Sequence, residues 1–572
     1  MTPRRAVSIR TAFLAGAAAM LAWPSLGAEV TPERLLNADK EPQNWLMNHR
    51  TYDGQRFSPL AQINKGNVKG LKLAYAVGLG GGSPNEFAEA TPLVEDGYLY
   101  LTDSWGVLYK IDGRSGEFGR IVWRMDPKQA KHDGANRGAA FWGNLVISPA
   151  NHPARIIATD KDSGKVVWET AVAYGQPDLM VTGAPLAIGD KIVFGAAGGD
   201  RGVRDWIAAL DAATGKLIWR KFTIPAPGEP GSETWKGTTS AWQTGGGAVW
   251  VTGTYDPETK QTIWGTGNPV PMFDPTYRPG DNLYTNSAIS WDPDTGAMNW
   301  YFQYTPGDMW DYDEVGTHIL IDGVVAGEPR KLVTHSGRNG VLYTMDRHNG
   351  QVVVAKPYMD INWTKGIDQK TGKPIDYDPN RDIQIYSGVA NQASGEPGKR
   401  ACPSHVGGNN HWPSSYSRRT GLIYIAAQTG CDNMLIDTAK HNKEKGWNGG
   451  GYWTNDRYES NLTAVDPLTG EIKKNLHLRY PNYSGTLATA GGLVFTGLTD
   501  GTVAAFDDTT LDQLWATNLG SGINTPPMTF AVNGKQYVVF VAGAGSQAMK
   551  QLVNTREVKE QRNALMVFVF AL

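Results

Sequence analysis

The sequence predicts an all-β fold, a β-propeller built from tryptophan-docking repeats. Among the 572 residues are 68 glycines and 20 tryptophans, a composition that favours many short strands joined by tight turns. A short phrase also recurs along the chain: an apolar strand, Asp, a few turn residues, Gly and then Trp. Strand repeats of several tens of residues that end in a docking aromatic are typical of propeller blades and not of a sandwich.

The first 28 residues have the layout of a secretory signal peptide. Three arginines within the first ten residues precede an apolar stretch at residues 12–23, which Pro24 breaks before the small residues Gly27 and Ala28. We expect cleavage after Ala28, a mature domain of residues 29–572 and a periplasmic location. The alternative is a membrane anchor, which the early proline and the short apolar stretch disfavour because a spanning helix needs roughly 20 apolar residues.

Charge and motif content exclude several classes of function. The chain carries 54 basic and 56 acidic side chains, a balance that gives no indication of nucleic-acid binding. No Gly-x-Gly-x-x-Gly follows a strand and no Walker-type loop is present, so nicotinamide and ATP chemistry are disfavoured. The two cysteines, Cys402 and Cys431, predict one disulfide in an exported protein. Without a Cys-x-x-Cys-His motif, covalent haem is not expected.

Each repeated phrase predicts a hairpin. The clearest copies lie at residues 157–168, 209–219 and 289–300, and weaker copies begin at Asp112, Asp346, Asp466 and Asp507. Asp supplies the local hydrogen bond and Gly the positive φ that a tight turn needs. We therefore expect each Asp-to-Gly segment to join two strands of one blade, with the Trp on the second strand.

The last residues and the longest gaps complete the predicted ring. The run from residue 564 to 572 is strongly apolar, and we expect it to close the ring by pairing with the N-terminal blade. Wide gaps after Asp211 and after Asp346 indicate long insertions. In a propeller such insertions lie at the ends of the blades, so we expect them to converge on one central pocket.

Acidic residues stand beside large aromatics in one segment, Trp310-Asp311-Tyr312-Asp313, which follows Asp308 closely. This density indicates a desolvated anionic site. The alternative, which these residues alone do not exclude, is that they are solvated acids of a surface loop. Asp200 and Asn268 occur in similar glycine-rich surroundings. Hard oxygen donors of this kind suit calcium or a similar cation.

Three stretches, residues 225–231, 265–269 and 278–284, are similar to characteristic stretches of the PQQ-dependent methanol and ethanol dehydrogenases, where PQQ is pyrroloquinoline quinone. The whole mature chain resembles this quinoprotein family. The resemblance implies an eight-bladed propeller, a structural disulfide between Cys402 and Cys431, and oxidation of an alcohol with hydride transfer to PQQ. It also implies a soluble cytochrome c as electron acceptor, and a homodimer is common in the family.

The resemblance also assigns roles to single residues. Asp311 resembles the catalytic base, and Asp313 resembles the extra carboxylate of the lanthanide-using branch. The metal set is Asp200, Asn268, Asp311 and Asp313. The residues that match PQQ contacts are Glu89, Arg137, Thr182, Gly198, Gly199, Trp250, Arg338 and Asn410. A flat tricarboxylate needs an aromatic face, cations and hydrogen-bond donors, and Trp250 resembles the indole on which the quinone stacks.

The chain departs from the family pattern at several positions. Lys131 and His132 stand where two adjacent cysteines are usual, Asp200 replaces a longer glutamate, and Ala248 replaces a threonine. Phe495 replaces another aromatic, and Ser546 and Gln547 stand where a Trp is expected. These changes predict a cofactor pocket of altered shape.

The sequence leaves the cation and the substrate open. Asp200, Asp311, Asp313 and a PQQ carboxylate would place about four negative charges around one ion, which favours a lanthanide over Ca²⁺. The shortened Asp200 argues the other way. A larger secondary alcohol or a polyol is an alternative substrate, and a non-enzymatic propeller scaffold is the alternative function.

Overall fold

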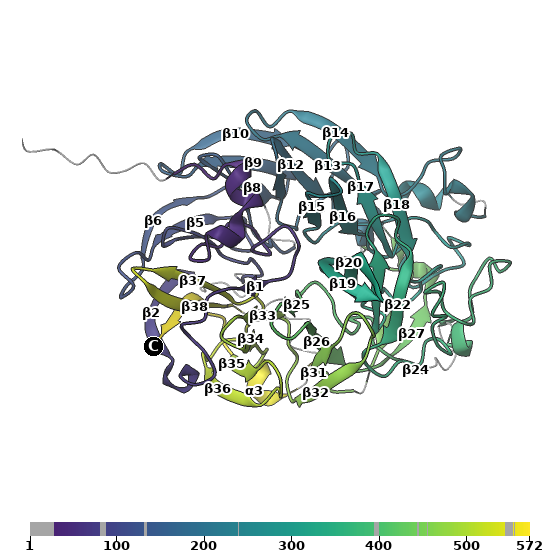
Figure 1. The fold of residues 1–572 in the computed structure, drawn as a ribbon. Helices are drawn as coiled ribbons and strands as arrows, with labels where there is room; N and C mark the ends of the chain where they lie inside the picture. Colours follow the sequence, from purple (N-terminus) through teal and green to yellow (C-terminus); the bar gives the residue numbers. More distant parts are fainter. Residues whose placement is uncertain are drawn as a thin grey trace, which may run out of the picture.

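The computed structural model describes residues 28–80, 87–130, 134–237, 240–389, 391–393, 400–442, 446–454, 456–543, 553 and 555–572. Within these residues eight sheets of four or five strands are arranged around a ring (Figure 1). This confirms the predicted all-β, eight-bladed propeller. The four strands of a blade pair antiparallel in chain order, except that β26 (Leu422–Thr429) pairs with β31 (Glu459–Val465) across an insertion and β2 (Lys72–Gly80) pairs with β39 (Leu565–Ala571) from the other end of the chain.

The strands of the first four blades are β3 (Leu93–Glu95), β4 (Tyr98–Thr102), β5 (Leu108–Asp112) and β6 (Arg120–Met125); β7 (Ala140–Trp142), β8 (Leu145–Ala150), β9 (Arg155–Asp160) and β10 (Val166–Ala171); β11 (Leu186–Ile188), β12 (Lys191–Gly195), β13 (Trp206–Asp211) and β14 (Leu217–Phe222); and β15 (Thr254–Asp256), β16 (Gln261–Gly265), β17 (Ser287–Trp291) and β18 (Met298–Gln303).

The strands of the other four are β19 (Ile319–Val325), β20 (Glu328–Ser336), β21 (Val341–Asp346) and β22 (Val352–Pro357); β25 (Ser415–Ser417), β26 (Leu422–Thr429), β31 (Glu459–Val465) and β32 (Ile472–Leu478); β33 (Thr486–Thr489), β34 (Leu493–Gly497), β35 (Thr502–Asp507) and β36 (Gln513–Asn518), with β1 (Phe57–Ser58) parallel to β33; and β37 (Met528–Val532), β38 (Lys535–Ala542), β39 (Leu565–Ala571) and β2 (Lys72–Gly80).

Short elements lie outside the blades. They include the helices α1 (Pro32–Leu36) and α3 (Arg556–Lys559), the 3-10 turn η3 (Gly199–Arg201), and the small strands β23 (Gln392–Ala393), β24 (Arg400–Ala401), β27 (Asp432–Ile436), β28 (His441–Asn442), β29 (Gly446–Trp447) and β30 (Gly450–Trp453). The helices are short, and among the described residues none is long and apolar enough to cross a bilayer.

The repeated Asp-Gly-Trp motif forms a turn between two strands of one blade and also a contact between neighbouring blades. In the turn after β13, the N–H of Gly215 donates to the Asp211 carbonyl at 2.8 Å. The indole of Trp168, on the fourth strand of the preceding blade, lies against this turn and donates to the Ala212 carbonyl at 3.1 Å. A Cβ on Gly215 would come within 2.5 Å of that indole, and φ is +69° there. Glycine is therefore required on steric and conformational grounds.

The same contact recurs between other blades. A Cβ on the turn glycine would meet a tryptophan ring of the preceding blade in the pairs Gly164 with Trp123, Gly296 with Trp219 and Gly350 with Trp300. Tryptophan docking is thus an inter-blade contact, which explains why Asp, Gly and Trp recur together in the sequence.

The C-terminal strand closes the ring, but it pairs with an N-terminal strand inside the last blade and not, as expected, with the first blade. β39 pairs antiparallel with β2, from Lys72 opposite Ala571 to Gly80 opposite Leu565, and with β38 on its other side. In Figure 1 the C-terminus lies beside β2. β2 is therefore the outer strand of the last blade. Pairing the two chain segments leaves the ring without an open junction.

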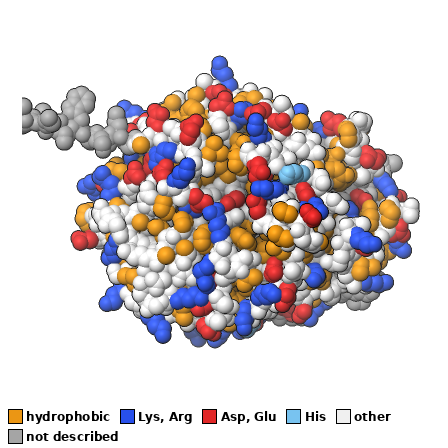
Figure 2. All heavy atoms as spheres, in the orientation of Figure 1, with side chains coloured by type: hydrophobic (Ala, Val, Ile, Leu, Met, Phe, Trp, Pro, Cys, Tyr) orange, Lys and Arg blue, Asp and Glu red, His pale blue; other side chains and the backbone are white. Residues whose placement is uncertain are grey.

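Cys402 and Cys431 form the predicted disulfide, with their Cα atoms 4.5 Å apart. It ties the long insertion between β22 and β25 to the β26–β27 region. On the face shown in Figure 2, basic and acidic side chains are interspersed, in keeping with the balanced charge of the chain.

Candidate active site

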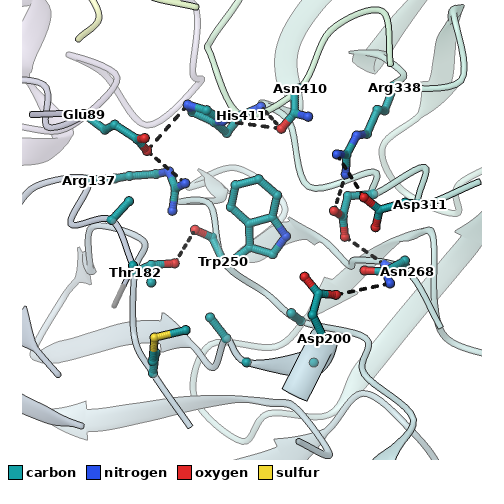
Figure 3. A pocket seen from close by; sticks show the side chains of 18 of the residues that line it. Glu89, Arg137, Thr182, Asp200, Trp250, Asn268, Asp311, Arg338, Asn410 and His411 are labelled. Carbon is teal, nitrogen blue, oxygen red and sulfur yellow. Dashed lines mark hydrogen bonds and ion pairs between the residues drawn. The ribbon is translucent and has the colours of Figure 1, made fainter. Parts of the chain in front are cut away.

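One cavity of about 350 Å³ brings together every residue that the sequence assigned to the cofactor or the cation (Figure 3). Those residues are Glu89, Arg137, Thr182, Gly198, Gly199, Asp200, Trp250, Asn268, Asp311, Asp313, Arg338 and Asn410. The cavity volume is in the range of small-molecule sites in proteins, roughly 300–1,000 Å³.

The cavity is built from loops at one face of the ring. Loops between consecutive blades supply Glu89, Arg137, Thr182, Trp250, Asp311, Asp313 and Asn410, and loops between the second and third strands of a blade supply Asp200, Asn268 and Arg338. Because neighbouring strands are antiparallel, both kinds of loop emerge on the same face. The Asp-to-Gly hairpins join third and fourth strands and therefore lie on the opposite face. The long insertions after β14 and β22 carry Trp250 and Asn410, as predicted.

Local backbone constraints hold the acidic loop. Both oxygens of the Asp308 carboxylate accept backbone N–H groups, one from Trp310 and one from Tyr312, each at 3.2 Å. Between them Asp311 has a φ of +67°, a conformation that Asp tolerates better than most residues. The buried Arg278 donates to the Asp308 carbonyl at 2.7 Å. The sequence Asp-x-Trp-Asp-Tyr thus fixes one tight loop that presents Asp311 to the cavity.

The anionic side of the cavity contains three carboxylates and one amide. The Asn268 backbone N–H donates to Asp313 Oδ1 at 2.8 Å, and its Nδ2 donates to Asp200 Oδ1 at 3.4 Å. Arg338 Nη2 lies 3.4 Å from Asp311 Oδ2, and Nη1 forms a short ion pair with Asp313. The side-chain oxygens of Asp200, Asn268 and Asp311, which could coordinate a metal ion, lie on one side of the cavity (Figure 3).

Burial makes two of these carboxylates, Asp200 and Asp311, costly to ionise. It raises the pKa of Asp200 to about 6, with the nearby Asp313 adding to the rise. Burial likewise raises the pKa of Asp311 well above its ordinary value, although Arg338 opposes the shift. Clustered carboxyls in a closed pocket are stabilised by a cation. The donor set therefore fits a hard, oxygen-binding metal ion. Among the described residues, however, no three His, Cys, Asp or Glu side chains by themselves form a metal-binding group.

The other side of the cavity presents an aromatic face and a cation. Arg137 Nη2 pairs with Glu89 Oε2 at 2.9 Å, and its guanidinium carbon lies 4.5 Å from the centre of the Trp250 ring. Thr182 Oγ1 donates to the Trp250 carbonyl at 3.5 Å. Trp250 is only partly buried and its indole faces the cavity, not the packed interior (Figure 3). These groups fit a flat, anionic ligand.

The sequence reasoning missed four polar residues that line the cavity: Arg201, His411, Tyr483 and Asn524. The ring centre of His411 lies 5.8 Å from that of Trp250, and its Nε2 lies 3.6 Å from Glu89 Oε2. Its position beside Asn410 in the chain was the available signal. Tyr483 and Asn524 stand in no motif, so only the folded ring brings them to the site.

The residues that depart from the family pattern differ in their distance from the cavity. Ala248 lines the cavity, so its small side chain alters the pocket directly. Phe495 is fully buried in β34 and packs edge-to-face on Phe540. Lys131, His132, Ser546 and Gln547 lie outside the described residues.

Comparison with known proteins agrees with this geometry. A family model for the β-propeller domain of glucose, ethanol and alcohol dehydrogenases that use PQQ matches residues 45–362 and 453–538. The quinoprotein alcohol dehydrogenase PedH of Pseudomonas putida is 35% identical over 92% of this chain and 90% of its own length. A quinoprotein ethanol dehydrogenase of Pseudomonas putida is 33% identical over 90% of this chain and 88% of its own.

Solved structures give the same result. A structure described as europium-containing methanol dehydrogenase superposes with a TM-score of 0.86 at 30% identity, covering 94% of this chain and all of that one. The quinohemoprotein alcohol dehydrogenase of Comamonas testosteroni gives a TM-score of 0.84 at 32% identity, covering 94% and 84%. The chain belongs to the family of PQQ-dependent quinoprotein alcohol dehydrogenases.

Proposed function

We propose that this quinoprotein oxidises an alcohol to an aldehyde or ketone at the described cavity, with Asp311 as the base. The observation that carries the proposal is the placement of Asp311. Its carboxylate shares one cavity with the Trp250 indole and the Arg137 guanidinium, and Arg338 holds it at 3.4 Å. A proton acceptor, a stacking face and cations for an anionic cofactor therefore stand together.

PQQ would be held by the aromatic side of the cavity. Trp250 offers a face to the planar rings, while Arg137 and Asn410 offer a cation and an amide to the carboxylates and carbonyls. When bound, PQQ would supply the hydride acceptor for the carbinol carbon of the alcohol. The protein itself binds, orients and screens the reactants.

Asp311 would take the hydroxyl proton of the alcohol. Burial and the neighbouring carboxylates favour its protonated form, while Arg338 favours the ionised form. Arg338 thus keeps a base available in the cavity, and the buried carboxylate is a stronger proton acceptor than one in water.

A metal ion would be held by Asp200, Asn268, Asp311 and Asp313, with further oxygen atoms from PQQ. Its chemistry is that of a Lewis acid. Three carboxylates favour a lanthanide over Ca²⁺, and the similarity to a europium-containing methanol dehydrogenase supports this preference. Reconstitution of metal-free protein with La³⁺ or Ca²⁺ decides the point, because higher activity with Ca²⁺ would reverse the preference.

The variant Asp311→Asn tests the proposed base. The amide keeps the size of the side chain and cannot accept the proton, so we expect normal PQQ binding and loss of dye-linked alcohol oxidation. The matched control is Asp322→Asn on β19 of the same propeller, where Asp322 is 61% exposed and activity should be unchanged. Near-normal turnover by Asp311→Asn would refute the assignment.

Export and partners complete the proposal. Residues 1–28 would be removed as a signal peptide, which places the enzyme in the periplasm, and the disulfide is in keeping with an oxidising compartment. Electrons would leave to a soluble cytochrome c, and the protein would form a homodimer. N-terminal sequencing of the exported protein checks the first point, since an N-terminus other than residue 29 contradicts the predicted cleavage.

The alternatives predict different results. A non-enzymatic propeller would show no absorption change when PQQ and metal are added. A screen of primary, secondary and polyhydric alcohols on the loaded enzyme ranks the substrates. Ala248 lines the cavity with a small side chain, which favours a bulkier alcohol.

A further inference from the structure

Asp205 is a buried carboxyl immediately behind the wall of the cavity. It stands between η3 and β13 and is 0% exposed. Its backbone is held firmly: the N–H donates to the Gly246 carbonyl at 3.1 Å, and its carbonyl accepts from the backbone N–H and the hydroxyl of Thr223, each at 3.1 Å. The position of the side chain is therefore set by rigid elements.

Neither carboxyl oxygen of Asp205 has a hydrogen-bond partner within the described part of the chain. Burying a carboxyl without a partner costs folding free energy, because the group loses its hydrogen bonds to water and forms none with the protein. Such groups are uncommon in native proteins, and each one calls for an explanation such as an ion that neutralises it.

The neighbours of Asp205 point to the cation site. Its Oδ2 lies 3.0 Å from the place that a Cβ on Gly199 would occupy. Gly199 lines the cavity and directly precedes Asp200. Burial raises the pKa of Asp205 well above its ordinary value, and the charges on Asp200 and Asp313 raise it further. Asp205 is thus within electrostatic reach of two proposed metal ligands.

We propose that Asp205 is a further residue of the cation site: with a cation bound, its ionised carboxylate supplies negative charge from behind Gly199 and so strengthens the binding of a highly charged ion. The inference rests on the proposed function and adds to it a residue outside the direct ligand set. The attraction grows with the charge of the ion, so a trivalent ion gains more than a divalent one. The charge of Asp205 also compensates for the side chain of Asp200, which is one methylene shorter than a glutamate.

Direct metal binding tests the proposal. Metal-free wild type, Asp205→Asn and Asp205→Ala are loaded with PQQ, and the affinities for Tb³⁺ and Ca²⁺ are measured by terbium luminescence and by calorimetry. Loss of such a supporting group weakens metal binding by about 10–100-fold. We expect a loss of that size for Tb³⁺ and a smaller loss for Ca²⁺. The control Asp112→Asn removes the same charge at a hairpin on the opposite face and should leave both affinities unchanged.

Thermal melting separates this role from a structural one. Removing an unpartnered buried carboxyl should leave the metal-free protein as stable as wild type or more stable, while the rise in melting temperature on adding metal becomes smaller. A structural role would lower the stability of both forms. Unchanged Tb³⁺ affinity in folded Asp205→Asn and Asp205→Ala would overturn the inference alone. Absence of metal binding by wild type would overturn the proposed metal site as well.

Discussion

Arg338 neutralises two carboxylates, and replacing it with Met tests the electrostatics of the site. The guanidinium contacts Asp311 at 3.4 Å, forms a short ion pair with Asp313, and is only 6% exposed. Removing one partner of a buried ion pair costs about 3–5 kcal/mol, because the other partner keeps an uncompensated charge. The entropy of unfolding is about 2.1 cal/mol/K per residue, or about 1.2 kcal/mol/K for a chain of this length. The expected fall in melting temperature is therefore about 2.5–4 °C.

The assay is thermal denaturation of the metal-free protein, followed by the same scan with a trivalent cation. We expect the cation to restore part of the stability of Arg338→Met, because it supplies the missing positive charge. Arg330→Met is the matched control: its guanidinium also lies 3.4 Å from a carboxylate, that of Asp346, but its side chain is 46% exposed. A surface pair contributes about 0–1 kcal/mol, so the control should melt within about 1 °C of wild type. Equal melting temperatures for Arg338→Met and Arg330→Met would refute the reasoning.

Three further predictions concern the ring, the disulfide and the cofactor face. Trp219→Ala removes a buried indole that packs on the turn at Gly296 and should cost about 3–5 kcal/mol of stability; a melting temperature equal to that of wild type would contradict inter-blade docking. Replacing Cys402 and Cys431 with Ala opens a link between residues 29 apart and should cost about 3–4 kcal/mol, and wild type treated with reductant should melt at the same temperature as this variant. Trp250→Ala should weaken PQQ binding by roughly tenfold or more, since aromatic stacking contributes about 1–3 kcal/mol; unchanged affinity in a spectroscopic titration would exclude Trp250 as the stacking face.

Much of the fold could be predicted because its repeated turns are local in sequence and the inter-blade tryptophan contact recurs with them. Asp211 and Gly215 close one tight turn, and the turn must carry glycine because Trp168 lies on it. The apolar run that forms β39 could be predicted to close the ring because such a strand needs a partner on each side. The blade count came from the resemblance, since the weaker copies of the repeat are too irregular to count.

The site was predictable where residues stand in motifs and unpredictable where only the ring assembles them. Asp311 and Asp200 occur in distinctive acidic or glycine-rich phrases. Tyr483 lies in the loop between the sixth and seventh blades, Asn524 in the loop between the seventh and eighth, and neither has a local signal. The same holds for Asp205: burial, the missing partners and the contact with Gly199 are properties of the folded wall and not of the sequence.

Stoichiometric loading of the purified mature protein with PQQ tests the proposed site most directly. PQQ is titrated with La³⁺ or Ca²⁺ present, absorption is followed, and dye-linked ethanol oxidation is measured at each step. We predict that one PQQ binds per chain and that activity rises in proportion, with none in the absence of either PQQ or cation. Failure to bind PQQ, or alcohol oxidation that proceeds without it, would contradict the assignment of this cavity.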